Sequence, residues 1–353
     1  MDRVVKMNFS TWQGMRTRDP RRLVLGTAGW GAPYGIANQN GQPTREAIGD
    51  LLEQAERAGI RCLDTARAYP GSEVLVGELT AAADAQESWR VVTKLDPSVH
   101  TPGLGLGDVL ERVAESLAES RRALESDALP TLLLHRAEHR HVCGGRLWRM
   151  LLAERDAGRI GSLGVSAASP EQAWAALEDP DIEVLQVATS LLDLRLYRQG
   201  FFARARELGR TVYVRSVYLQ GIAHLDPARL PEPLAGLGEA LRPIHGLARE
   251  LGVPARTLFL AFVREIPGAL PVLGFENAAQ LAEALEDWDS DVVGAASLAA
   301  LVDALPEIPD ALLDPSRWPS FEVGAARRID AGQERRDAEA NRTGPPSVAT
   351  LRA

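Results

Sequence analysis

The sequence predicts a (β/α)8 TIM barrel, an α/β fold, with an N-terminal arm before it and a C-terminal helix and tail after it. Short apolar runs alternate with amphipathic helical segments from residue 22 to residue 290. Eight such repeats within about 270 residues match this barrel in strand number and in length. The apolar runs are continuous rather than alternating, which is typical of parallel strands that are covered on both faces.

The candidate strands are short and rich in Val, Leu and Ile. They cover residues 23–26, 60–64, 90–94, 131–135, 162–166, 183–187, 211–215 and 270–274. A doubly wound parallel sheet is the alternative arrangement, but no G-x-G-x-x-G motif follows the first candidate strand. The barrel is therefore the favoured fold.

Amphipathic stripes predict helices between the strands. Apolar residues recur at helical spacing in two of these segments: Ile48, Leu51, Leu52 and Ala55 in one, and Val109, Leu110, Val113 and Leu117 in the other. Gly59 follows the first stripe, where the end of a helix favours left-handed backbone. Ser169 begins the sequence Ser-Pro-Glu-Gln, a capping box that fixes a helix start just after the fifth strand.

We expect three regions along the chain. Residues 1–20 form an N-terminal arm, and residues 21–320 form the barrel with its C-terminal helix and loops. Residues 294–304 look helical and can pack on the barrel, whereas residues 321–353 are charged, contain Gly and Pro, and are expected to be a flexible tail.

Composition restricts the class of protein. The 353 residues are 45% hydrophobic and 25% charged, as expected for a soluble globular enzyme. The net charge of -9 argues against a nucleic-acid partner, because binding phosphates requires a basic face. No apolar run reaches the roughly 18 to 20 residues that span a bilayer, so no membrane partner is expected.

The cysteine content and the N-terminal sequence predict a cytoplasmic protein. The N-terminus lacks the apolar stretch of a secretory signal. Cys62 and Cys143 are too few for a disulfide framework. The sequence leaves the oligomeric state open.

Four chemically complementary residues follow consecutive strands. Asp64 ends the second candidate strand, Tyr69 lies in the next loop, and Lys94 and His135 end the third and fourth strands. In a (β/α)8 barrel these strand ends form the active-site face, so the four side chains are expected to converge. A free tyrosine has a pKa of about 10 and donates poorly at pH 7. An ammonium held by a carboxylate lowers that pKa, and an imidazole can polarise a carbonyl, so the set predicts carbonyl reduction.

A histidine-rich loop follows the fourth strand. His135, His139, His141 and Cys143 have a spacing that suggests a zinc site. Because His135 already belongs to the catalytic set, we interpret the segment as a polar loop over the site and predict no metal.

The segments LDTARAYPGSEVLVGE, VVTK, LLLHR, GVSAASPEQA and EVLQV resemble the signature blocks of the aldo-keto reductase superfamily, and the resemblance covers residues 22–290. It implies that Tyr69 is the proton donor and that Lys94 lowers its pKa. It further implies that Asp64 anchors Lys94 and that His135 orients the carbonyl.

The resemblance also implies a nicotinamide cofactor. Ser166 and Gln186 match positions that hold the nicotinamide carboxamide, and residues 270–285 resemble the block that holds the adenosine half. The expected cofactor contacts are Gly26, Thr27, Ser166, Gln186, Arg215, Ser216, Gly274, Glu276, Gln280 and Glu283. Trp30, in the first loop, and His135 are expected to contact the substrate.

Three positions depart from the family pattern. Ala167 replaces the asparagine of a common Ser-Asn pair, and Arg215 stands where many members stack a tyrosine on the nicotinamide. In the adenosine block no Lys or Arg is available for a 2′-phosphate, and Glu276 could instead accept hydrogen bonds from a ribose hydroxyl. The family favours NADP(H), while the local residues leave NAD(H) open.

The expected function is reduction of an aldehyde or ketone by hydride transfer from the nicotinamide. The polar loop suggests a sugar or a polar natural-product intermediate as substrate, and the Ala-, Arg- and Gly-rich composition suggests bacterial secondary metabolism. An acid in one direction is a base in the other, so a dehydrogenase or a redox-neutral epimerase of a sugar or cyclitol alcohol is an alternative. A non-catalytic, cofactor-sensing partner subunit is another.

Overall fold

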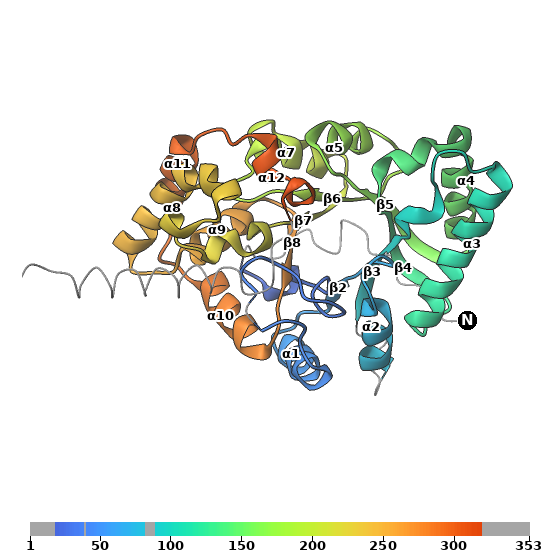
Figure 1. Cartoon of the computed structure of the whole chain (residues 1–353), viewed down its shortest axis with the longest axis horizontal. Coiled ribbons are helices and arrows are strands. Elements are labelled where there is room, and N and C mark those ends of the chain that lie inside the picture. The colour runs from blue at the N-terminus through green and yellow to red at the C-terminus, as the bar shows by residue number, and fades with distance from the viewer. Residues whose placement is uncertain (1–17, 39, 82–88, 320–353) are drawn as a thin grey trace, which may run out of the picture.

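In the computed structural model, eight parallel strands form a closed barrel with helices around it (Figure 1). The structure describes residues 18–38, 40–81 and 89–319. The predicted tail and most of the predicted arm lie outside the described residues. No described helix is both long enough and apolar enough to cross a membrane.

Every predicted strand is confirmed, with each end within two residues of its expected position. The strands are β1 (Val24–Gly26), β2 (Cys62–Asp64), β3 (Arg90–Leu95), β4 (Leu129–Leu134), β5 (Ile160–Ser166), β6 (Val184–Ala188), β7 (Thr211–Arg215) and β8 (Ala269–Gly274). Each strand pairs with the next one in sequence, and β8 closes the barrel by pairing with β1. This strand order excludes the doubly wound sheet.

Helices follow the strands as the apolar stripes predict. The described α-helices are α1 (Arg45–Arg57), α2 (Ser72–Ala81), α3 (Leu106–Ala123), α4 (Val142–Asp156), α5 (Pro170–Leu177), α6 (Arg195–Arg198), α7 (Phe201–Glu207), α8 (Gly238–Leu251), α9 (Ala255–Glu265), α10 (Ala278–Asp289), α11 (Ala295–Ala304) and α12 (Asp310–Leu313). Short 3-10 helices include η2 (Pro20–Arg22), η4 (Pro97–Val99), η5 (Ala137–His141), η6 (Leu219–His224), η7 (Pro227–Arg229), η8 (Glu232–Leu237) and η9 (Pro315–Arg317).

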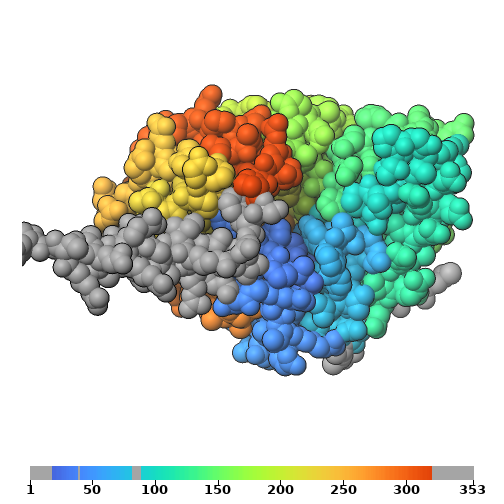
Figure 2. Space-filling view, viewed as in Figure 1, coloured from blue at the N-terminus to red at the C-terminus, as the bar shows by residue number. Residues whose placement is uncertain are grey.

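The local signals act as expected. The apolar stripe of α1 is buried, and Gly59 after it has φ +81°. The Ser169 side chain caps α5 by accepting a hydrogen bond from the backbone N–H of Gln172. The predicted helix at 294–304 is α11, which packs against α9. The helix α12 lies against η8, and the space-filling view shows these red and yellow segments side by side (Figure 2).

The inside of the barrel is filled with side chains. One buried layer consists of Val24, Cys62, Val92, Leu133, Val184, Tyr213 and Leu270. At the N-terminal end of the strands, the buried Arg22 guanidinium donates to the carbonyls of Arg264, Ile266 and Ala269. The barrel is therefore a packed core, and the predicted site residues lie at the opposite, C-terminal ends of the strands.

Candidate active site

A buried ion pair joins the ends of β2 and β3. The Lys94 ammonium donates to both carboxylate oxygens of Asp64, at 2.8 and 2.9 Å, and to the carbonyl of Thr65 at 2.9 Å. Burial by itself lowers the pKa of Lys94, but the charges of Asp64 and Tyr69 outweigh it and raise that pKa. An unpaired ammonium would be costly in this interior. The pair therefore keeps Lys94 protonated at neutral pH.

Tyr69 lies directly beside this ammonium. The loop after β2 makes a tight turn in which the Tyr69 N–H donates to the carbonyl of Ala66. The Lys94 nitrogen is 5.1 Å from the centre of the Tyr69 ring, close enough for its charge to act on the phenol. The structure therefore brings together the cation and the phenol that the sequence analysis required to be neighbours.

His135 completes the group from the end of β4. Its ring meets the Tyr69 ring edge to face, with centroids 6.1 Å apart and planes at 90°. Burial, followed by the charges of Lys94 and Arg215, lowers the pKa of His135 to about 4. The imidazole is therefore neutral at pH 7. Its Nδ1 atom is buried and has no hydrogen-bond partner within the described structure.

Ser166 and Gln186 are neighbours across β5 and β6. Gln186 donates from Nε2 to Asp64 Oδ1 at 2.7 Å, so it is oriented by the ion pair. Its Oε1 accepts a long hydrogen bond of 3.5 Å from the Ser166 hydroxyl. A hydroxyl donor beside an amide oxygen complements a carboxamide, which has both an acceptor and donors. These residues therefore fit the nicotinamide group that the sequence implies.

Arg215 reaches from the end of β7 to the loop after β5. It donates to the carbonyl of Ala167 at 3.0 Å and to the Ser216 hydroxyl at 3.3 Å. Ser216 itself has left-handed backbone, with φ +61°. No carboxylate pairs with Arg215 in the residues that the structure describes, so its positive charge is available to a ligand.

The predicted contacts in and after β1 are used mainly by the protein itself. The buried Thr27 hydroxyl contacts the Ser72 hydroxyl at 2.6 Å and donates to the Asp64 carbonyl at 3.1 Å. Trp30 is 1% exposed, and its indole N–H donates to the carbonyl of Phe275 at 3.4 Å. Thr27 therefore supports the end of β2, and Trp30 is held against the loop after β8; direct contact of either residue with a ligand stays a prediction.

Gly26 and Gly274 lie side by side where β1 and β8 close the barrel. A Cβ atom added to Gly26 would come within 3.1 Å of the Val272 side chain, so the wall is tight at that residue. Gly274 is exposed at the end of β8. The backbone there is accessible to a ligand, as expected for the predicted cofactor side of the mouth.

The predicted adenosine block separates into two parts. Glu276 and Gln280 form one corner between β8 and α10, because the Glu276 N–H donates to the Gln280 side-chain oxygen at 2.8 Å. Glu283 lies farther along α10, where its mostly exposed carboxylate pairs with Arg256 of α9 at 3.1 Å. The corner and Glu283 therefore have different local partners.

Two polar residues at the mouth, Tyr34 and Gln220, carry no signal in the sequence that predicts their position. Tyr34, in the loop after β1, is 51% exposed, and its hydroxyl interacts with the Gln220 side chain. Partial burial at the mouth raises the pKa of Tyr34, and so does the nearby Tyr69 phenol. A lone loop tyrosine has no spacing that predicts this position, although Pro33 and Gly35 on either side mark a turn.

The loop that carries Tyr34 is held against the loop after β7. The Ile36 N–H donates to the Gln220 carbonyl at 3.0 Å. Gln220 and Gly221 both have left-handed backbone, with φ +53° and +95°. A Cβ atom on Gly221 would lie 2.5 Å from the Ala37 side chain. This close approach fixes the two loops relative to each other.

The histidine-rich loop forms η5 and the start of α4. His139 is buried and meets the His100 ring edge to face at 5.8 Å, while Cys143 is a free thiol with φ +52°. Across the described ranges, no group of three or more His, Cys, Asp or Glu side chains is arranged to hold a metal ion.

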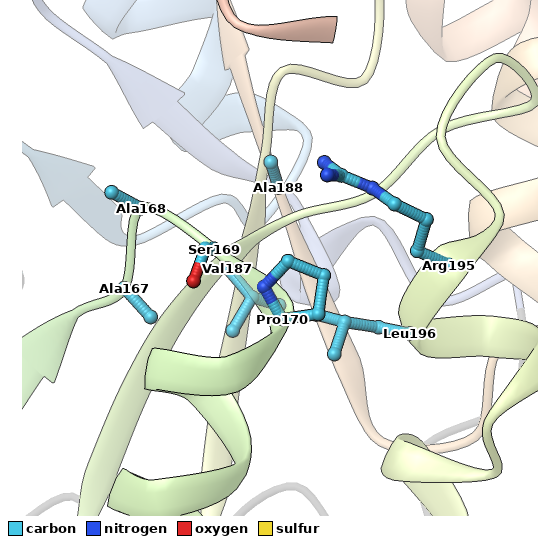
Figure 3. Close-up of a pocket in the computed structure, with 8 residues that line it drawn as sticks. All are labelled: Ala167, Ala168, Ser169, Pro170, Val187, Ala188, Arg195 and Leu196. Atoms are coloured by element: carbon cyan, nitrogen blue, oxygen red, sulfur yellow. The ribbon is translucent and has the colours of Figure 1, made fainter. Parts of the chain in front are cut away.

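A small pocket lies beside the mouth, between the start of α5 and the side chain of Arg195 (Figure 3). The Ser169 hydroxyl there is already the cap of α5, and Arg195 is paired with Asp193 and Asp310. The charged and capping groups that line this pocket therefore already have partners within the chain.

Comparison with solved structures agrees with the barrel. A glycerol dehydrogenase from Gluconobacter oxydans superposes with a TM-score of 0.61 at 20% identity, covering 85% of this chain and 94% of that one. An aldo-keto reductase from Bacillus halodurans in its holo form gives 0.62 at 19% identity, covering 81% and 93%. An aldo/keto reductase from Klebsiella pneumoniae, in complex with NADP and acetate, gives 0.59 at 20% identity, covering 81% and 92%. At these identities the likeness concerns the fold.

Comparison by sequence identifies the family. No curated protein matches the chain in sequence. The pattern of the Aldo/keto reductase family, however, matches residues 22–302, which is most of the chain and includes all eight strands. The chain therefore belongs to the aldo/keto reductase family, whose enzymes are oxidoreductases that use nicotinamide cofactors.

Proposed function

We propose that this protein reduces the carbonyl group of a small aldehyde or ketone, with Tyr69 as the proton donor. The observation that carries the proposal is the buried Lys94–Asp64 ion pair with its ammonium against Tyr69. A phenol in contact with a fixed cation can give up its proton, because the cation stabilises the phenolate that remains.

A reduced nicotinamide bound at this mouth would supply the hydride for the carbonyl carbon. Ser166 and Gln186 are the proposed partners of its carboxamide, and the unpaired Arg215 guanidinium is a proposed contact for its ring or for a phosphate. The NADP in the Klebsiella complex supports NADP(H) for the family. NAD(H) is the alternative for this chain.

The remaining step is transfer of one proton to the carbonyl oxygen. Tyr69 donates this proton as negative charge develops on the oxygen, and Lys94 holds the resulting phenolate. His135 is neutral, so it can donate a hydrogen bond to the same oxygen without itself being deprotonated. One hydride and one proton convert the carbonyl to an alcohol, and the same residues serve the reverse oxidation.

The proposed substrate is polar. The groups at the mouth include the Tyr34 phenol, the Gln220 amide and the Arg215 guanidinium, all of which can hydrogen-bond to hydroxyls. The relative named as a glycerol dehydrogenase supports a small polyol or its carbonyl form. Sugars and hydroxylated carbonyl compounds are therefore the first compounds to test.

The test is turnover of the full chain with NADH or NADPH and a panel of hydroxylated aldehydes and ketones, followed by loss of the reduced-nicotinamide absorbance. We expect Tyr69→Phe to lower kcat by about 10²- to 10⁴-fold, as for loss of a positioned acid, with dinucleotide binding unchanged. Tyr197→Phe, on α6, is the matched control and should keep full activity. Wild-type turnover by Tyr69→Phe would rule out the proposed proton donor.

A further inference from the structure

The corner between β8 and α10 holds a fixed carboxylate. Glu276 accepts hydrogen bonds from the Asn40 amide at 2.9 Å and from the Gln280 amide at 3.4 Å. Its own N–H is bound by the Gln280 side-chain oxygen. A loop residue before α1 and a residue in the first turn of α10, which are far apart in sequence, therefore orient this one carboxylate.

This corner is also where a barrel of this type commonly binds phosphate. The loops after the last two strands and the N-terminus of a nearby helix supply the amide groups for an anion. In this chain the corresponding helix is α10 (Figure 1). Its first turn is already capped, because Asn277 accepts from the Gln280 N–H at 3.0 Å. Glu276 adds a negative charge at the same helix end.

In the described part of the chain, no positive charge lies beside Glu276 to balance a further anion. Within residues 18–38, 40–81 and 89–319, Glu276 has no Lys or Arg at ion-pair distance. On the neighbouring helix α9, Arg256 is already bound to Glu283 and to Asp287, at 3.1 and 2.7 Å. A phosphate group placed beside Glu276 would therefore meet repulsion without a compensating cation.

The two nicotinamide dinucleotides differ only by the phosphate on the ribose 2′ oxygen. A carboxylate accepts hydrogen bonds from the ribose hydroxyls of NAD(H), whereas the 2′-phosphate of NADP(H) needs a cationic partner. Repulsion between a carboxylate and a phosphate in a solvated corner changes affinity on the order of tenfold.

We propose that Glu276 makes this chain select NAD(H) over NADP(H). This inference rests on the proposed function, because it requires a dinucleotide at the barrel mouth. It separates this chain from the Klebsiella relative that was crystallised with NADP.

The experiment measures Kd for NADH and NADPH with the full chain, by titration calorimetry in the absence of any carbonyl compound. We expect the wild type to bind NADH about tenfold more tightly than NADPH. Glu276→Gln should bring the two Kd values closer together, because it removes the repulsion between the carboxylate and the 2′-phosphate. Glu276→Arg should reverse the ratio, because a guanidinium pairs well with a phosphate.

The matched control is Glu286→Gln, which removes an exposed negative charge from the same helix without touching the corner. It should leave the ratio of the two Kd values unchanged. This inference alone is overturned if the wild type binds NADPH as tightly as NADH or more tightly. It is also overturned if the ratio of the two Kd values is the same in the wild type and in the Glu276 variants. If neither NADH nor NADPH binds, the proposed function is overturned as well.

Discussion

The two sides of the barrel mouth hold their charges in different ways. At the ends of β2 and β3, Asp64 and Lys94 are 4% and 1% exposed and neutralise each other. At the ends of β7 and β8, Arg215 and Glu276 are partly exposed, and among the described residues they are hydrogen-bonded only to neutral groups. A buried charge needs its partner, whereas a partly solvated charge can be exchanged without loss of the fold.

Two of the three departures from the family pattern lie on the exposed side, and the third, Ala167 after β5, is buried. The buried side has the expected Asp, Tyr, Lys and His in their expected places. The exposed side has Arg215 in place of a stacking tyrosine, and its adenosine block contains Glu276 but no Lys or Arg. We infer that the chemistry is set by the buried side and that the choice of cofactor and substrate is set by the exposed side.

The largest expected effect is on stability. Asp64→Asn leaves the Lys94 ammonium buried without its counter-charge, so we expect the free energy of unfolding to fall by about 3–5 kcal/mol. Urea unfolding at pH 7 measures this fall. Glu276→Gln, the comparable change on the exposed side, should cost less than about 1 kcal/mol. If the free energy of unfolding fell by similar amounts in the two variants, the two sides of the barrel mouth would not differ in how they hold their charges.

The pH dependence of stability probes His135 on the buried side. Its pKa is about 4 in the folded protein, below the ordinary value of 6.5. Between these two values the unfolded chain binds a proton that the folded protein excludes, so stability falls as the pH falls. From pH 7 to pH 4 this effect amounts to up to about 3 kcal/mol.

We therefore expect His135→Gln to lose less stability than the wild type on acidification, as measured by urea unfolding at each pH. His141→Gln, which changes an exposed histidine in the adjacent loop, should behave like the wild type. If His135→Gln and the wild type lose stability equally, the imidazole is not held neutral by its surroundings.

The smallest expected effect is on the exposed side. Tyr34→Phe removes the hydroxyl that interacts with Gln220 at the mouth. The loss of one hydrogen bond to a polar substrate corresponds to about 0.5–1.5 kcal/mol, so we expect KM to rise by about 2- to 10-fold while kcat changes little. Steady-state kinetics with a hydroxylated carbonyl compound test this. An unchanged KM would place Tyr34 outside the substrate site.

The sequence predicted the barrel well because its strands are buried on both faces. Each βα unit therefore carries a continuous apolar run, as 131–135 does, followed by an amphipathic helix. Asp64, Lys94 and His135 were found because a strand end in a barrel has a known position. Their convergence follows from topology without any knowledge of side-chain rotamers.

The sequence could not predict contacts that depend on loop conformation. Tyr34 meets Gln220 only because left-handed residues in the loop after β7 bring the two loops together. Likewise, the burial of Trp30 depends on how its loop folds back onto Phe275. Such contacts produce no periodic pattern of apolar residues in the sequence, because they join single residues from loops that are distant in sequence.

We propose that Lys94 acts on the reaction through Tyr69. A double-mutant cycle tests this claim most directly, with single-turnover reduction measured in the wild type, Lys94→Met, Tyr69→Phe and the double variant, each saturated with reduced dinucleotide. We predict that the double variant is no slower than Tyr69→Phe, because the cation has no effect once the phenol is gone. Rate losses that multiply in the double variant would show that the two residues act independently and would contradict the account.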